Sequence, residues 1–232
     1  MSTLHPDFPI SAAEEPLSGS CHAWRRRLAA HWPHKLALLL TVPVIFKSLY
    51  VACQHAPNLV PRHWPLTWID HAIRFDPSWT WIYLSIYLLL PLAPFLTTDR
   101  GRLAAYVRGT AFMSVVAFGC FFFLPVEMAR PGDPTSHPAY AALVAIDRPV
   151  NCFPSMHVGF AVFALLHLQR LRRTEWPEMP ANWLWAGWLW VAAIIVSTLV
   201  TKQHYLIDLP AGAALAWLSD FLGHRRYRRS AA

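Results

Sequence analysis

The stretch WTWIYLSIYLLLPLAPFL, from Trp79 to Leu96, decides the fold of this chain because its 18 consecutive residues include no aspartate, glutamate, lysine or arginine. A helix needs about 20 mostly apolar residues to cross the hydrocarbon core of a membrane. Six stretches approach this length: Lys35–Cys53, Trp79–Leu96, Leu103–Leu124, Pro154–Leu168, Trp183–Thr201 and Tyr205–Leu222. The pattern predicts an all-α polytopic membrane protein with six transmembrane helices. A soluble helical bundle is the alternative, but uncharged stretches of this length are rare in that class.

The composition agrees with a membrane protein. Hydrophobic residues make up 55% of the 232 residues and charged residues only 14%, and the mean hydropathy is +0.31. So few charges would not cover the surface of a soluble globule of this size. The formal net charge of +7 is accounted for by attraction to an anionic lipid surface, so we expect no nucleic-acid partner.

The basic residues alternate between the two sides of the predicted spans. One side receives Arg25, Arg26, Arg27, Lys35, Arg100, Arg102, Arg108, Arg170, Arg172, Arg173, Arg225, Arg226, Arg228 and Arg229. The other side receives Arg62, Arg74, Arg130, Arg148 and Lys202. Cytoplasmic loops are enriched in lysine and arginine. We therefore expect both termini in the cytoplasm and the loops that carry His157 and His204 on the periplasmic, extracellular or lumenal face.

The same pattern predicts the domain organisation. Residues 1–33 form a cytoplasmic N-terminal tail, disordered over its first 19 residues; residues 34–224 form a six-span membrane catalytic domain; residues 225–232 form a basic cytoplasmic tail. Residues 57–77 suit either a helix in the membrane interface or a loop anchored by aromatic side chains. The connection from Pro125 to Phe153 is polar and rich in proline, which predicts a stiff loop with no regular helix through it. Such a loop could hold an anion.

A histidine and an aspartate stand four positions apart at the start of the last predicted span. A helix that begins at His204 would place His204 and Asp208 on one face, one turn apart. The carboxylate can then accept a hydrogen bond from one ring nitrogen. This fixes the tautomer, leaves the other nitrogen as a nucleophile and stabilises the positive charge that develops when it attacks.

A second motif, Pro154-Ser155-Met156-His157, stands at the start of another predicted span. Pro154 fits a helix-initiating position, and the free N–H groups of a first helical turn bind phosphate oxygens. From that turn, His157 could protonate a leaving oxygen as a general acid. A nucleophile, its orienting acid, a proton donor and an anion cradle together predict phosphoryl transfer without a metal or a cofactor.

These residues resemble the type 2 phosphatidic acid phosphatase (PAP2) superfamily, which has a Pro-Ser-x-His run and a later His-x-x-x-Asp run on a six-span chain. The resemblance covers residues 103–222 in detail and the whole chain in topology. It implies that His204 becomes phosphohistidine, that Asp208 orients it and that His157 is the acid.

The resemblance also implies phosphate contacts by Ser155 and by Arg130, the arginine of an Arg-Pro pair. Three other places depart from the family pattern. Phe123 stands where the family has lysine, Met156 where it has glycine, and Ser197-Thr198 where it has Ser-Arg. Two cationic phosphate ligands of the family are therefore absent.

We expect Lys202 and Arg148 to take the place of these cations, because a phosphate needs donors rather than one particular side chain. Cationic surroundings suit an anion better than zinc, so we expect no metal. The cysteines show no metal-type spacing. Cys53 and Cys152 both fall near the outer face, where a disulfide is chemically allowed and free thiols are the alternative.

The combined expectation is an integral membrane phosphohydrolase that acts on a lipid phosphate ester through a phosphohistidine intermediate. The altered cations also resemble the branch that contains inositol phosphorylceramide and sphingomyelin synthases. That resemblance implies a phospholipid head-group transferase as the alternative, since only the acceptor differs. A non-catalytic transporter or scaffold is the second alternative. The expected partner is a lipid substrate, and the oligomeric state stays open.

Overall fold

The computed structural model describes residues 17–55, 60–131, 133 and 137–230. Parts of the two predicted tails, residues 1–16 and 231–232, lie outside the described residues. Within the described part the elements are all helical, which confirms the predicted all-α class.

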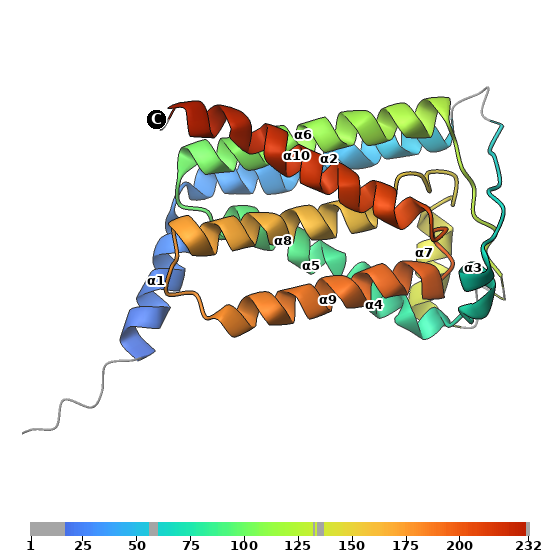
Figure 1. The fold of residues 1–232 in the computed structure, drawn as a ribbon, viewed down its shortest axis with the longest axis horizontal. Helices are drawn as coiled ribbons and strands as arrows, with labels where there is room; N and C mark the ends of the chain where they lie inside the picture. The colour runs from blue at the N-terminus through green and yellow to red at the C-terminus, as the bar shows by residue number, and fades with distance from the viewer. Residues whose placement is uncertain (1–16, 56–59, 132, 134–136, 231–232) are drawn as a thin grey trace, which may run out of the picture.

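The long helices run side by side along the molecule (Figure 1). They are α2 (Trp32–Gln54), α6 (Arg100–Phe123), α8 (Met156–Thr174), α9 (Ala181–Val200) and α10 (Asp208–Ser230). A further segment is divided into η1 (Pro77–Trp79), α4 (Thr80–Leu84) and α5 (Ile86–Leu96). Three shorter helices are α1 (Leu17–Ala29), α3 (Trp68–Ala72) and α7 (Pro138–Ile146).

Four helical segments of the described chain are long and apolar enough to cross a membrane: Trp32–Gln54, Pro77–Leu96, Arg100–Phe123 and Ala181–Val200. They correspond to four of the six predicted spans. α8 and α10 correspond to the other two, but neither is among these four. The six-span count therefore stays a prediction.

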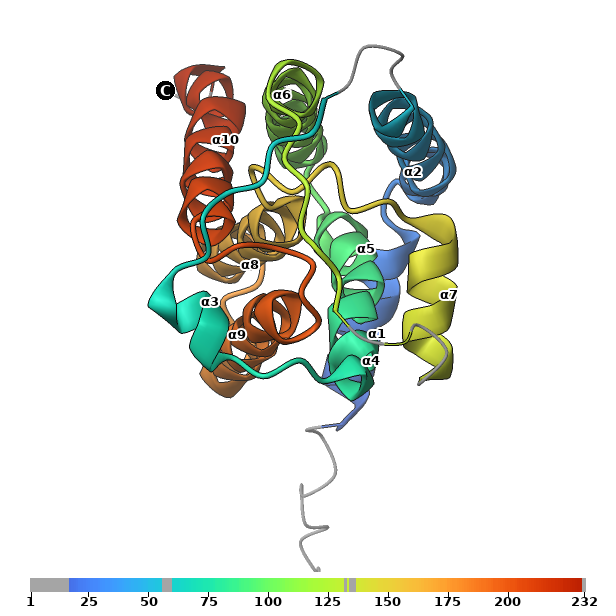
Figure 2. The same cartoon turned by 90° about the vertical axis from the view of Figure 1, so that its right-hand side faces the viewer.

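α8 is the core of the bundle. It packs against α10, α9, α5 and α6, and Figure 2 shows it enclosed by these helices. Its buried residues include Ala161, Phe163, Ala164 and Leu165. An apolar helix surrounded in this way is sheltered from solvent on most sides, which makes it a rigid support for a site at its first turn.

Glycines let α10 lie close to its neighbours. A Cβ atom on Gly212 would overlap the carbonyl oxygen of Ser155, just before α8, and one on Gly223 would stand 2.6 Å from the carbonyl oxygen of Ala105 in α6. Real Cβ atoms do not make such contacts with backbone, so these two positions accept only glycine unless the helices move apart.

Several basic residues that are predicted to be cytoplasmic belong to α1 and to the start of α2, at the end of the bundle where α1 lies (Figure 1). Lys35 Nζ donates to the carbonyl oxygen of Phe95 at 2.7 Å, and Arg27 Nη1 donates to that of Leu96 at 3.2 Å, so both cations bind the last carbonyls of α5. Arg27 is buried and lies 4.4 Å from the ring centroid of Trp176. The region predicted as an N-terminal tail therefore includes a helix, α1, that packs on the bundle.

The loops at the opposite end run alongside one another. Arg62 bridges to Val126, and Val126 bridges to Asn151, both in parallel. Backbone hydrogen bonds of 2.9 Å from Glu127 to Arg62 and 3.2 Å from Cys152 to Val126 hold these segments together. The expectation of a loop without a helix is wrong over 138–146, which forms α7. The helix begins with Pro138, and proline is tolerated in the first turn because an N–H group there has no hydrogen-bond partner within the helix.

Candidate active site

The two motif histidines meet at the loop end of the bundle. His157 belongs to the first turn of α8, and His204 belongs to the turn between α9 and α10. α10 begins at Asp208 and not at His204, so the predicted helical relation between these two residues is wrong. The two side chains nevertheless meet, because the turn folds back over the first residue of α10.

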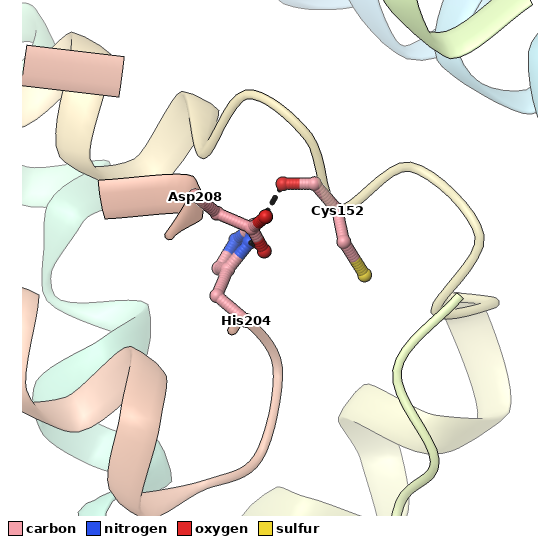
Figure 3. A group of neighbouring side chains, drawn as sticks. All are labelled: Cys152, His204 and Asp208. Carbon is pink, nitrogen blue, oxygen red and sulfur yellow. Dashed lines mark hydrogen bonds and ion pairs between the residues drawn. The ribbon is translucent and has the colours of Figure 1, made fainter. Parts of the chain in front are cut away.

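The His204 ring is held from one side by two acceptors. Nδ1 lies 2.9 Å from the carbonyl oxygen of Cys152 and 3.3 Å from Asp208 Oδ2 (Figure 3). A backbone carbonyl can only accept, so Nδ1 carries the ring proton. The neutral ring then has its lone pair on Nε2, the nitrogen that can attack an electrophile.

Asp208 is completely buried. Its Oδ2 accepts from the backbone N–H of Tyr205 at 2.9 Å as well as facing the His204 ring. Its Oδ1 has no hydrogen-bond partner among the described residues. The carboxylate therefore closes the turn and stands where it can stabilise positive charge on the ring.

His157 faces the same space from α8. Its Nε2 is buried and has no partner among the described residues, and its ring stacks on Tyr83 of α4 with centroids 3.9 Å apart. The centroids of His157 and His204 are 6.1 Å apart. A ring nitrogen that attacks phosphorus starts from about 3–3.5 Å, and a second ring nitrogen must reach the leaving oxygen by a hydrogen bond. Two histidine rings with these roles need a separation of this order.

Ser155 joins the two motifs. It is the N-cap of α8, its Oγ accepts from the N–H of Val158 at 3.4 Å, and its own N–H donates to the carbonyl oxygen of Asp208 at 3.2 Å. The side chain is fully buried. Its hydroxyl proton is not used by the cap, so it can still donate to a phosphate oxygen.

Arg130, a predicted phosphate ligand, is bound to other residues in this structure. Its Nη2 lies 2.7 Å from Asp147 Oδ2 and 2.6 Å from Gln203 Oε1, and its Nη1 donates to the carbonyl oxygen of Asp147 at 2.5 Å. Gln203 immediately precedes His204 in the chain. Arg130 is therefore joined to the turn that carries His204 through one intervening side chain.

Lys202 and Arg148, the two cations expected to bind phosphate, donate to backbone carbonyls of other segments in this structure. Lys202 Nζ donates to the carbonyl oxygens of Asp70 and Ile73, both at 2.7 Å. Arg148 is exposed, and its Nη1 donates to the carbonyl oxygen of Gln54 at the end of α2, at 2.9 Å. The structure thus brings His157, His204, Asp208 and Ser155 together. It places Lys202 beside them and Arg148 toward α2.

Sequence reasoning missed four contributors to this site. The carbonyl of Cys152 leaves no signal in a sequence, because any residue supplies one. Tyr83 belongs to a span that reads as uniformly apolar. Asp147 and Gln203 bind Arg130, and the sequence alone indicates neither contact. The one available signal is the position of Gln203, immediately before His204.

Three side chains here have donor atoms within 4.8 Å of one another, those of Cys152, His204 and Asp208. The group fits a metal poorly. In Figure 3 the sulfur of Cys152 points away from the ring while its carbonyl points toward it, and Sγ donates to the carbonyl oxygen of Pro149 at 3.1 Å. Burial also raises the pKa of this thiol well above its usual range, whereas metal ligation needs the thiolate. Cys53 and Cys152 are both free thiols in the structure.

The comparisons with known proteins agree with this geometry. A family model described as the PAP2 superfamily matches residues 50–222. No curated protein and no solved structure matches the chain. The matched region includes both histidine motifs, and the superfamily is an all-helical membrane fold whose members are generally phosphatases or phosphotransferases. Because this match extends over most of the chain, the protein belongs to the PAP2 superfamily.

Proposed function

We propose that this protein is an integral membrane phosphohydrolase that cleaves a lipid phosphate ester through a phosphohistidine intermediate. The observation that carries the proposal is the bond from His204 Nδ1 to the carbonyl oxygen of Cys152. This bond leaves Nε2 of the buried His204 ring with a free lone pair. The ring centroid of His157 lies 6.1 Å from that of His204, and Nε2 of His157 has no partner among the described residues.

In the first step His204 Nε2 attacks phosphorus and a nitrogen–phosphorus bond forms. The bond from phosphorus to the leaving oxygen breaks, and that oxygen takes the proton of a protonated His157. The negative phosphate favours this charged form of His157. Asp208 stabilises the positive ring of the phosphohistidine through Nδ1.

In the second step an acceptor hydroxyl attacks phosphorus and its proton passes to the now neutral His157. The nitrogen–phosphorus bond breaks and His204 is restored. Ser155, and Arg130 once it releases Asp147, bind the phosphoryl oxygens in this mechanism, with Lys202 at the edge of the site. If the acceptor is water the enzyme is a phosphatase. If it is a lipid or sugar hydroxyl the enzyme is a head-group transferase, the alternative function.

The proposal includes a topology. Residues 34–224 cross the membrane six times, both termini are cytoplasmic, and the site opens on the other face, where a lipid can reach it sideways between helices. The segregation of basic residues to the end opposite the histidines supports this orientation.

The test is an assay of purified protein in detergent with a chelator present. Phosphatidic acid, diacylglycerol pyrophosphate, a prenyl diphosphate, and phosphatidylinositol with ceramide are supplied in turn, and free phosphate and new lipids are measured together. We expect a product that disappears in His204→Ala and persists in His34→Ala, a matched change of an exposed histidine at the other end of the bundle. Free phosphate identifies a phosphatase and a new phospholipid identifies a transferase. Activity that survives His204→Ala, or no product from any substrate, would favour the non-catalytic alternative.

A further inference from the structure

A cavity of about 570 Å³ lies beside the turn that carries His204, between the segment 66–75 and the segment 128–131. This volume is in the range of small-molecule sites in proteins. Lys202, two residues before His204, forms part of its wall, as does Arg130. The cavity therefore lies against the segment that leads into His204, although His204 itself does not line it.

The wall of the cavity carries three cationic side chains, those of Arg74, Arg130 and Lys202. Arg74 is exposed, and within the described part of the chain its guanidinium makes no hydrogen bond or ion pair. Arg130 retains a buried Nε without a partner among the described residues, on a side chain that is only 10% exposed. Lys202 donates two of its three ammonium protons to carbonyls and has one left. Arg74 and Lys202 can therefore still donate to an anion, and Arg130 can do so once it releases Asp147.

The carboxylate in this wall, Asp70, offsets part of this positive charge, because it interacts electrostatically with Lys202. Asp70 Oδ2 accepts from the N–H and the hydroxyl of Thr67 at 2.8 and 2.6 Å, and Oδ1 accepts from the N–H of Leu206 at 2.9 Å. Burial alone would raise the pKa of Asp70, but these hydrogen bonds and the charge of Lys202 outweigh it and the pKa is lowered. Asp70 faces Lys202 and Asp147 pairs with Arg130, so the charge of Arg74 is the one that these carboxylates leave in excess.

The backbone at Lys202 is also unusual. Its φ is 51°, in the left-handed region that residues other than glycine rarely adopt. The two bonds from Nζ to the 70–73 backbone and the bond from Leu206 to Asp70 hold this conformation. Strained backbone that is held in this way concentrates at functional sites. The same bonds tie the cavity wall to the turn that carries His204.

We propose that this cavity is a head-group subsite that binds a second anionic group, a phosphate or a carboxylate, on the lipid whose phosphate His204 attacks. The proposal rests on the proposed function and names its substrate class: a phospholipid with a further negative charge in its head group. Phosphatidic acid has no atoms beyond its phosphate and would leave the cavity unused. Leu66, Phe75 and Met128 supply apolar walls for the carbon atoms of such a head group.

The test compares two soluble head groups that differ by one carboxylate, O-phosphoserine and phosphoethanolamine. Binding is measured by calorimetry on the full-length His204→Ala protein in detergent, so that no turnover occurs. We expect O-phosphoserine to bind about tenfold more tightly, the effect of one charge-assisted contact. In Arg74→Gln the two head groups should bind about equally, and in Arg74→Lys part of the preference for O-phosphoserine should remain.

The matched control is Arg62→Gln, because Arg62 is an exposed arginine of the same connection that does not line the cavity. It should keep the full preference. Equal binding of the two head groups, no binding of either, or a preference that survives Arg74→Gln would overturn the subsite. These outcomes are separate from the proposed function: a carboxylate preference in a protein without phosphoryl activity would support the subsite alone, and activity without the preference would support the function alone.

Discussion

The guanidinium of Arg130 lies 2.7 Å from the carboxylate of Asp147, and the side chains of the pair are only 10% and 13% exposed. An arginine expected to bind phosphate is thus already bound to an anion within the protein. A substrate phosphate must compete with Asp147 for the same donors. The pair keeps Arg130 oriented and its charge balanced until the substrate arrives.

Replacing Asp147 by asparagine should strengthen the binding of inorganic phosphate. The substitution keeps the size of the side chain and removes the competing charge, so we expect the dissociation constant to fall by about tenfold. Calorimetry on the purified protein measures it. Arg130→Gln should change the constant in the opposite direction. An Asp147→Asn protein that binds phosphate more weakly would mean that the ion pair chiefly positions Arg130.

Asp208→Asn should lower kcat by about 10²-fold, the low end of the range for proton-transfer groups. The loss is limited because the carbonyl of Cys152 still fixes the tautomer of His204 and only the stabilising charge disappears. Rapid-quench experiments with ³²P-labelled substrate should show acid-labile, base-stable label on the protein, formed more slowly in this variant. His204→Ala should show no such label, and label in that protein would contradict the assignment of the nucleophile.

Gly212→Ala should reduce both activity and stability. The new methyl group would meet the carbonyl oxygen of Ser155 and push the first turn of α8 away from α10, at a cost of about 1–3 kcal/mol. Thermal unfolding in detergent and kcat measure the two effects. Gly119→Ala is the control, because a Cβ there meets nothing within 4 Å, and it should leave both unchanged or raise stability by up to about 1 kcal/mol. Equal behaviour of the two variants would disprove the packing argument.

The stabilising effect of Asp70 should depend on pH. Its pKa in the folded protein is lowered from the ordinary value of 3.8, so its contribution is present above pH 3.8 and is lost as pH falls through the lower folded value. Asp70→Asn should therefore melt at a lower temperature than the parent protein at pH 7. The difference between the two melting temperatures, called the gap below, should disappear below pH 3.8. A gap that stays constant with pH would show that the charge of Asp70 does not contribute.

The proposed orientation can be tested by cysteine labelling in sealed, right-side-out vesicles. In Arg62→Cys the new thiol should react with a membrane-impermeant maleimide from outside, and in His34→Cys it should react only after permeabilisation. Both positions are exposed, His34 at the start of α2 and Arg62 beyond its end. The parent protein supplies the background from its own thiols. The reverse pattern would invert the topology and place the histidines on the cytoplasmic side.

The helices could be predicted because each depends on a local property of the sequence. Long apolar stretches mark α2, α6 and α9 without reference to the rest of the chain. The division at Ser85, between α4 and α5, could not be read in this way, since the residues on both sides are equally apolar. The sequence does not indicate α7, because the prolines of this connection argue against a helix through it, although the run between Pro138 and Pro149 has room for one.

The site was predictable in its residues and not in its contacts. The motifs identified His157, His204 and Asp208 by residue type and spacing. The bond from His204 to the Cys152 carbonyl depends on how two distant loops lie beside each other, and the ion pair of Arg130 with Asp147 depends on the path of a loop that contains a helix. Such contacts arise from tertiary register, on which a single sequence carries little information.

The ladder of loops that joins Arg62, Val126 and Asn151 also bears on how the protein is made. Its segments connect helices that are synthesised far apart in time, and His204 can bond to Cys152 only after the turn that precedes α10 has left the ribosome. The tautomer of His204 that the proposed mechanism needs is therefore fixed only after the segment that leads into α10 has been made. On that proposal, a nascent chain would carry both histidines before it could cleave any substrate.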